Sequence, residues 1–179
     1  MTVNGKLRTF LAIEISRDLA PASLFKRLNS EQRLRPVRTE NLHLTLEFFG
    51  EIEQVYIDKI EVAMQNVSFR EFSLEISGLG AFPDPYRGRV LFLSVKNHPE
   101  LDRIRNSILQ KLGREPGTVF VPHVTIARAK RSFNLEPLID EFMGISFVSK
   151  VNQITLFASE LTANGPKYRA LKKIMPISE

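Results

Sequence analysis

Two histidines of this chain stand in matching contexts, 80 residues apart. His43 begins the run His-Leu-Thr-Leu and His123 begins the run His-Val-Thr-Ile, so a threonine, Thr45 or Thr125, follows each histidine after two positions. Side chains alternate between the two faces of an extended strand. The spacing therefore predicts two strands, each with a histidine and a threonine on one face and apolar residues on the face that packs into the core.

These residue types suit the cleavage of a phosphodiester. The reaction needs a base that activates the attacking oxygen and an acid that protonates the leaving oxygen. Imidazole titrates near neutral pH, so one neutral and one protonated ring can coexist. Threonine hydroxyls can donate hydrogen bonds to phosphoryl oxygens. The third histidine, His98, lies in Lys96-Asn97-His98-Pro99 and is predicted to be a surface residue at the start of a helix.

A metal site is the main chemical alternative. A catalytic zinc ion normally takes a third protein ligand besides two histidines. Glu47 shares the predicted face of His43 and is the candidate for that ligand. A threonine two positions after both histidines is not a metal-ligand pattern, so we expect a metal-free site without a cofactor. The chain has no cysteine, which excludes disulfides, thiolate zinc sites, iron–sulfur clusters and cysteine nucleophiles.

The histidines belong to a longer internal repeat, in which residues 8–80 lie over residues 88–160. Apolar, β-rich runs predict strands in both halves, and helical periodicity predicts helices between them. Asn97 is a plausible helix cap and Gly113 a helix stop. The expected strands are 8–15, 41–48, 72–79, 88–95, 121–128 and 152–159, and the expected helices are 18–35, 53–66, 98–115 and 135–143.

Each half therefore has the order β-α-β-α-β. The duplication predicts an α+β protein in which two antiparallel-sheet lobes carry outer helices and enclose a central active-site groove. No low-complexity linker separates the halves, so residues 1–179 are predicted to form a single bilobal domain. The segment Phe82–Gly88 is the expected crossover loop. Residues 161–179 form a C-terminal closing segment, in which Tyr168–Leu171 is a candidate strand.

The charge pattern favours an acidic partner such as nucleic acid. The net charge is +5 and the sequence pI is about 9.6. The N-terminal apolar run is short and Glu14 interrupts it, and no segment approaches the roughly 20 apolar residues of a membrane helix. We therefore expect a cytoplasmic protein that does not associate with membranes. Basic residues cluster at Lys26, Arg27, Arg33, Arg35 and Arg38, at Arg128, Lys130 and Arg131, and at Lys167, Arg169, Lys172 and Lys173.

The paired motifs resemble the two signatures of the two-histidine phosphoesterase superfamily. Within it, the sequence is most similar to the RNA 2',3'-cyclic phosphodiesterases of bacteria and archaea, also called 2'-5' RNA ligases. The likeness covers nearly the whole chain. It includes Arg8-Thr-Phe-Leu-Ala-Ile, Arg38-Thr-Glu-Asn-Leu-His-Leu-Thr-Leu-Glu-Phe-Phe-Gly, Gly80-Ala-Phe-Pro, Arg89-Val-Leu-Phe-Leu, Phe120-Val-Pro-His-Val-Thr-Ile-Ala-Arg and Gly165-Pro-Lys-Tyr.

The resemblance implies a role for each motif residue. His43 matches the histidine that protonates the leaving 3'-oxygen, and His123 matches the histidine that activates water. Thr45 and Thr125 match threonines that bind phosphate. Arg128 matches an arginine that contacts phosphate, although strict alternation would put it on the face opposite His123, so that a twist, a bulge or the strand end must bring it round. The first motif has phenylalanine at the equivalent position, so the site is not fully symmetric.

The resemblance also implies the substrate, an RNA with a 2',3'-cyclic phosphate end that is hydrolysed to a 2'-phosphate. tRNA fragments are one candidate source, reversible 2'-5' RNA ligation is an implied second activity, and no obligate protein partner is expected. Tyr86 and Tyr168, which lie near prolines or glycines, are candidates for stacking a terminal base. Two alternatives stay open: the same chemistry on a small nucleotide or ADP-ribose cyclic phosphate, and an RNA-binding module without turnover.

Overall fold

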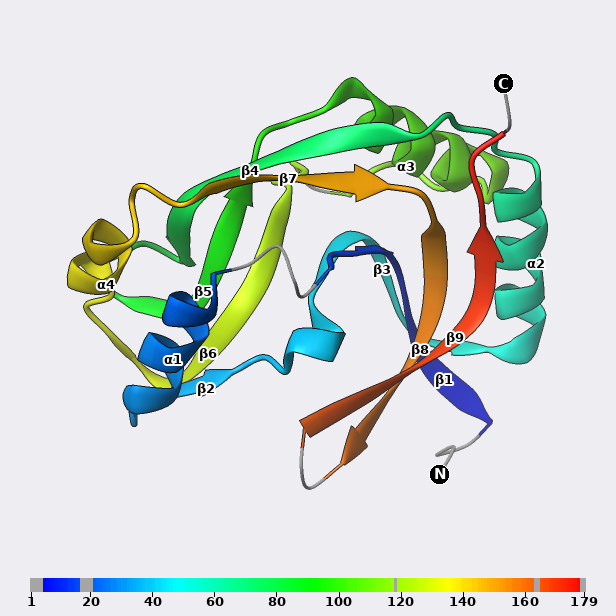
Figure 1. Ribbon diagram of the computed structural model, residues 1–179. Helices are drawn as coiled ribbons and strands as arrows, with labels where there is room; N and C mark the ends of the chain where they lie inside the picture. The colour runs from blue at the N-terminus through cyan, green and yellow to red at the C-terminus, as the bar shows by residue number, and fades with distance from the viewer. Residues whose placement is uncertain (1–4, 17–20, 118, 163–164, 178–179) are drawn as a thin grey trace.

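The computed structural model describes residues 5–16, 21–117, 119–162 and 165–177. Within these ranges the chain forms an α+β fold built on antiparallel strands, which confirms the predicted class (Figure 1). The strands are β1 (Lys6–Glu14), β2 (Leu34–Pro36), β3 (His43–Glu53), β4 (Phe72–Phe82), β5 (Gly88–Val95), β6 (His123–Phe133), β7 (Ser146–Val151), β8 (Ile154–Thr162) and β9 (Gly165–Ile174). The helices are α1 (Ala22–Ser30), α2 (Gln54–Gln65), α3 (Pro99–Lys111) and α4 (Glu136–Glu141), with a 3-10 turn at Thr39–Asn41.

The strands follow the order β7-β4-β5-β6-β3-β1-β8-β9, and β2 pairs with β6. We call β3, β1, β8 and β9 the first lobe, and β6, β5, β4, β7 and β2 the second lobe. The two lobes meet where β3 crosses β6, and their antiparallel ladder there has one pair of residues, Leu44 opposite Val124. Each member of this pair directly follows one of the two histidines. The junction therefore brings both histidines to the place where the lobes meet, close enough for the charge of His123 to act on His43.

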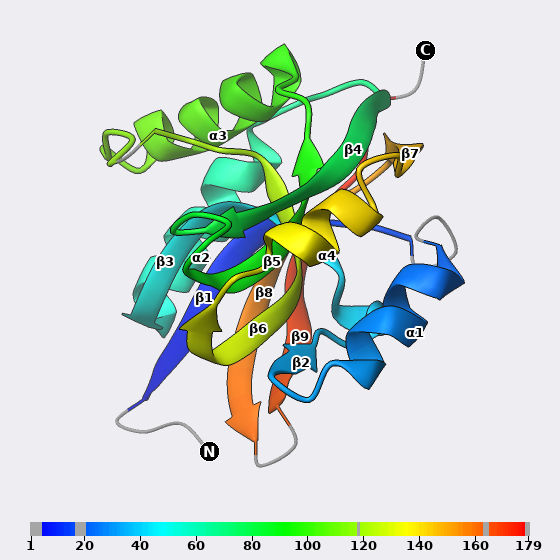
Figure 2. The ribbon, with the colours of Figure 1, turned by 90° about the vertical axis from the view of Figure 1, so that its left-hand side faces the viewer.

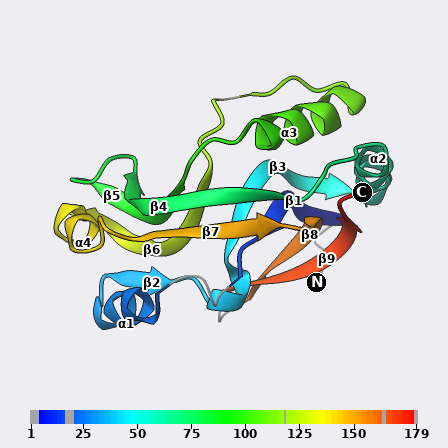
Figure 3. The same cartoon turned by 45° about the horizontal axis from the view of Figure 1, so that its top comes forward.

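The lobes do not coincide with the two halves of the repeat. The third strand of the first half, β4, pairs with β5 of the second half, and the third strand of the second half, β8, pairs with β1 of the first. The helices follow the same exchange, since α3 of the second half contacts α2 and β3 of the first. Figures 2 and 3 show α2 and α3 together on one side of the sheet. Each lobe is thus completed by the other half of the sequence.

One continuous hydrophobic core lies between the sheet and the helices. It contains the apolar residues that alternate with the histidine–threonine pairs, including Leu42, Leu44, Val124 and Ile126. The amphipathic face predicted for α3 is buried there through Leu101, Ile104, Ile108 and Leu109. A second, smaller cluster of Phe10, Ala12 and Phe157 is separate from this core, and Tyr168 packs against it. This cluster covers part of the face that carries the histidines.

All six predicted strands and all four predicted helices exist, with helix ends shorter than expected. The beginning of the first predicted helix includes residues 18–20, and the closing segment includes residues 163–164 and 178–179; these positions lie outside the described residues. The residue capping α3 is His98, whose side chain accepts a hydrogen bond from the Glu100 amide, and not Asn97. The Asn97 side chain instead donates to Asp102, at 3.2 Å.

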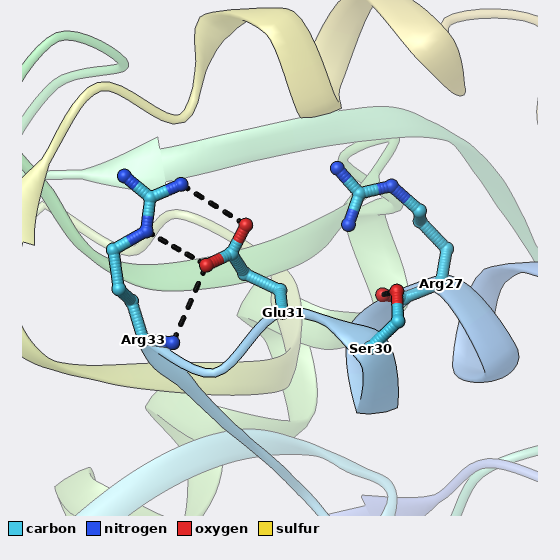
Figure 4. A network of polar contacts seen from close by, with 4 residues as sticks. All are labelled: Arg27, Ser30, Glu31 and Arg33. Carbon is cyan, nitrogen blue, oxygen red and sulfur yellow. Dashed lines mark hydrogen bonds and ion pairs between the residues drawn. The ribbon is translucent and has the colours of Figure 1, made fainter.

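A compact polar contact fixes the turn between α1 and β2 (Figure 4). The Glu31 carboxylate accepts hydrogen bonds from Nε and Nη2 of Arg33 at 2.7 and 3.0 Å, and these bonds hold its pKa at about 2. The Arg33 guanidinium also lies 4.0 Å from the ring centre of Phe133, at the end of β6. The turn is therefore held against the strand that carries His123, and β2 runs along the outer edge of β6.

Among the described residues, no helix combines the length and apolar character that a membrane crossing requires.

Candidate active site

The two histidines are anchored by the same backbone contact. Nδ1 of His43 lies 2.7 Å from the carbonyl oxygen of Asn41, and Nδ1 of His123 lies 2.7 Å from the carbonyl oxygen of Val121. A carbonyl can only accept, so Nδ1 carries the proton and donates in both rings. This fixes the neutral tautomer and leaves Nε2 available for proton transfer at each histidine.

The backbone around the two motifs repeats the same arrangement. The Ile15 amide donates to the carbonyl of Leu42, and the Val95 amide donates to the carbonyl of Pro122, in each case just before the histidine. Glu14 pairs with His43 across the strands, and Ser94 pairs with His123. These contacts are related by the 80-residue repeat. The duplicated sequence therefore produces duplicated positioning of the two rings.

Both histidine–threonine pairs lie half-buried on one side of their strands, while Leu44 and Val124 are buried on the other. A β-bulge follows each pair. On β6, Ala127 lies opposite Leu91 and Thr125 opposite Phe92, so Ile126 is the extra residue. On β3 the extra residue is Leu46, since Leu11 and Ala12 lie opposite Glu47 and Thr45. After each bulge, the side chains point to the faces opposite to those that strict alternation would give them.

The bulge on β6 explains how Arg128 reaches the site. Ile126 and Ala127 are both buried, and the exposed Arg128 comes next, on the face of His123 and Thr125. The sequence required a twist, a bulge or the strand end to bring Arg128 to the face of His123. The structure shows that a bulge does so. We call the side of the sheet that carries His43, Thr45, His123, Thr125 and Arg128 the histidine face.

The bulge on β3 has the opposite consequence for Glu47. It turns this residue away from His43, into a buried contact with the helix α3. There Arg105 donates from Nε to Oε2 at 2.9 Å, and its Nη2 lies 2.8 Å from the same oxygen. Glu47 is thus not available as a third metal ligand. Among the residues that the structure describes, no group of three or more His, Asp or Glu side chains could hold a metal ion. The Arg105–Glu47 pair could not be predicted from the sequence, because its partners are far apart in the chain.

Electrostatic coupling connects the members of the histidine face. Burial lowers the pKa of His43, and the charges of Arg128 and His123 lower it further. The hydrogen bond to the Asn41 carbonyl acts in the opposite direction and raises it. Since each positive charge disfavours a second one beside it, the substrate-free site favours the neutral form of His43. One imidazole that accepts a proton and one that donates it are the set that acid–base catalysis requires.

Aromatic rings surround each histidine. His43 lies 5.0 Å from Phe10 and 5.3 Å from Tyr168, measured between ring centres. His123 lies 5.1 Å from Phe82 and 5.3 Å from Phe92. These rings come from different strand positions in the two halves, so the walls of the site are less symmetric than the histidines themselves.

The two tyrosines named from the sequence have different places. Tyr168 on β9 faces His43 edge-on, and the Asn41 side chain donates to the carbonyl of Pro166 nearby on the same strand. Burial raises the pKa of Tyr168, while the charges of Arg128 and Arg8 oppose that rise. Tyr86 is exposed in the β4–β5 loop, where a hydrogen bond to Glu136 raises its pKa. The structure brings Tyr168 to the histidines and leaves Tyr86 at the far end of the second lobe, where β5 begins.

Comparisons with known proteins identify the family and relatives of this chain. The family model of the 2'-5' RNA ligase superfamily matches residues 16–162. The RNA 2',3'-cyclic phosphodiesterase of Archaeoglobus fulgidus is 32% identical over 173 residues, which cover 93% of this chain and 98% of that protein. The enzyme of the same name from Aeropyrum pernix is 36% identical over 154 residues, with coverage of 81% and 88%.

Solved structures show the same fold. The crystal structure of Escherichia coli LigT complexed with 3'-AMP has a TM-score of 0.78 at 23% identity and covers 97% of this chain and 99% of that one. The structure of TT0787 from Thermus thermophilus has a TM-score of 0.75 at 24% identity, with coverage of 94% and 97%. With the match of the family model to most of its length, the chain belongs to the 2'-5' RNA ligase superfamily.

Proposed function

We propose that this protein is an RNA 2',3'-cyclic phosphodiesterase that hydrolyses the cyclic end to a 2'-phosphate without a metal ion. The observation that carries the proposal is the pair of histidines, each fixed through Nδ1 to a backbone carbonyl and each accompanied by a threonine on the same face. Relatives of 32% and 36% identity carry the name of this activity, which supports the same reaction here.

In the proposed reaction, the oxygen of a water molecule attacks phosphorus and the bond from phosphorus to the 3'-oxygen breaks. His123 takes the proton from water, and His43 gives a proton to the leaving 3'-oxygen, as the family resemblance implies. The lowered pKa of His43 means that the bound phosphate anion must restore the proton on this ring. Thr45, Thr125 and Arg128 donate to the phosphoryl oxygens as negative charge builds up there.

The direct test is incubation with an RNA that ends in a 2',3'-cyclic phosphate, followed by identification of the product end. A 2'-phosphate is expected, and activity is expected to persist in EDTA. His43→Ala and His123→Ala should each lower kcat by about 10²-fold or more. His98→Asn is the matched control, because asparagine can still cap α3. Wild-type rates in both alanine variants would contradict the two-histidine reaction.

The roles of the histidines can be separated with a substrate in which sulfur replaces the leaving 3'-oxygen. A thiolate leaves without protonation, so the variant that lacks the general acid should recover much of its rate, and the variant that lacks the base should not. Recovery is expected for His43→Ala. Recovery of His123→Ala instead would reverse the assignment.

In 2'-5' ligation the 5'-hydroxyl of a second RNA replaces water as the nucleophile. This hydroxyl gives its proton to His123, and the 3'-oxygen leaves with a proton from His43, so that a 2'-5' phosphodiester forms. The superfamily to which the chain belongs is named for this reaction. We include this activity in the proposal, together with tRNA fragments as one source of cyclic ends. The absence of cysteine and the basic composition fit a cytoplasmic location and a nucleic-acid substrate.

A further inference from the structure

A second cationic position lies on the histidine face, beyond the histidine pair. Arg8 of β1 places its guanidinium carbon 4.9 Å from the ring centre of Phe48. Phe48 stacks on Phe10 at 6.1 Å, and Phe10 lies 5.0 Å from His43. A continuous row of three ring contacts therefore leads from the candidate catalytic ring to the guanidinium.

This guanidinium is free to bind an anion. Arg8 is exposed, and among the described residues no carboxylate forms a hydrogen bond or an ion pair with it. A guanidinium that lies over an aromatic ring uses its face, which leaves its N–H donors in the plane available for a phosphate. Phe48 is itself 46% exposed, which is unusual for a phenylalanine, and supports the guanidinium from below.

Arg8 and Arg128 serve different places on this face. Both charges act on Tyr168, the ring that covers His43 from the side of β9, but of the two only Arg128 is among the charges that lower the pKa of His43. Arg128 therefore suits the reacting phosphate, and Arg8 suits a group farther along the first lobe.

The second lobe has no such position. Phe48 of the first repeat corresponds to Arg128 of the second, and Arg8 corresponds to Gly88. Neither residue of the contact between Arg8 and Phe48 therefore has the same residue type at its equivalent position in the second half. Of the equivalent positions 8 and 88, only position 8 in the first lobe carries a cation beyond the reacting centre. The two ends of the site therefore differ, and the site has a direction.

We propose that Arg8, held over Phe48, binds the phosphodiester on the 5' side of the terminal nucleotide, and that the site is built for polynucleotide ends rather than for mononucleotides. This inference rests on the proposed function and names its substrate class. A nucleoside 2',3'-cyclic phosphate has no phosphate at the 5' position, and an RNA end has one. The terminal ribose and base then lie along the exposed ring of Phe48, between the two phosphates.

The test compares uridine 2',3'-cyclic phosphate with the dinucleotide UpU that ends in the same cyclic phosphate. In Arg8→Gln, the ratio of kcat/KM for the dinucleotide over the mononucleotide should fall by about tenfold to a hundredfold, as expected for a lost hydrogen bond to a charged group. A 5'-phosphorylated uridine 2',3'-cyclic phosphate should behave like the dinucleotide. The salt dependence of kcat/KM for the dinucleotide should also become shallower by about 0.7 in log–log slope, which corresponds to one lost contact to a single strand.

Arg87→Gln is the matched control, since Arg87 lies in the β4–β5 loop with its side chain 80% exposed and paired with Asp84. This variant also removes one positive charge, but at a position away from the histidine face. It should therefore leave the ratio of kcat/KM for the dinucleotide over the mononucleotide unchanged. Affinities for the 2'-phosphate products of both substrates give the same comparison without turnover, so the inference remains testable if hydrolysis itself fails. An unchanged ratio in Arg8→Gln, or an equal loss for both substrates, would overturn the inference and leave the two-histidine reaction untouched.

Discussion

The ion pair between Arg105 and Glu47 joins the two repeats beneath the site, and its removal gives a quantitative prediction. The Arg105 side chain is 7% exposed and that of Glu47 is 13% exposed. Arg105 comes from α3 and also lies 5.4 Å from the ring centre of Phe120, three residues before His123, while Glu47 lies four residues after His43. The pair thus connects the segments that position both histidines.

Replacing one partner leaves the other buried and poorly compensated. In Arg105→Met, Glu47 keeps the contact with Arg114, whose Nη2 lies 3.8 Å from its Oε1. We therefore expect a loss at the low end of the range for broken buried pairs, about 3 kcal/mol of unfolding free energy. For a domain of this size, this corresponds to a fall of about 6–12 °C in Tm.

The double variant Arg105→Met, Glu47→Leu separates the net contribution of the pair from the cost of an unpaired charge. Apolar residues of similar volume often replace a buried ion pair without loss. The double variant should therefore be more stable than Arg105→Met and lie within about 1.5 kcal/mol of the wild type. Urea unfolding followed by circular dichroism measures all variants. If the double variant lost as much stability as the two single variants together, Arg105 and Glu47 would not be coupled, which would contradict the prediction.

Further predictions concern the site itself. Arg128→Gln removes a positive charge that lowers the pKa of His43, so the limb of the kcat/KM–pH profile that reports this ring should move to higher pH. Because the pKa of His43 is lower in the folded than in the unfolded chain, stability should decline as pH falls below about 6.5, and His43→Gln should flatten this decline in urea titrations. Thr125→Val should lower kcat by about 10²-fold with little change in Tm, since it removes a hydroxyl donor to the phosphate. Tyr168→Ala should raise KM for RNA in steady-state assays, whereas Tyr86→Ala should not.

The sequence predicts the histidine–threonine pairs well, because the alternation of side chains along a strand is a local property. Thr45 and Thr125 fall on the faces expected for them, up to the bulges. Beyond that point local alternation fails. The bulge at Ile126 depends on how β6 pairs with β5, and it decides that Arg128 turns toward the histidines. The equivalent bulge at Leu46 decides that Glu47 turns away from them.

Pairings between distant segments escaped prediction for the same reason. The repeat indicates two equivalent halves, but it does not say which strand pairs with which. The short strands β2 and β7 were not predicted. β2 has three residues, and the expected helix 18–35 extended over the first two of them. His98 was predicted at the surface; it is half-buried, caps α3 and stacks on Phe72 at 4.7 Å.

The exchange of third strands between the repeats also bears on how the protein is made. During synthesis, β1 leaves the ribosome long before β8, although Phe10 and Phe157 are direct neighbours in the finished sheet. Until then one edge of β1 has no strand beside it, and such an edge can pair with another chain. Ladders between distant segments also form slowly, because the intervening chain must be closed into a loop first. The nascent N-terminal half is therefore the stage most exposed to misassembly, and a chaperone would be most useful there.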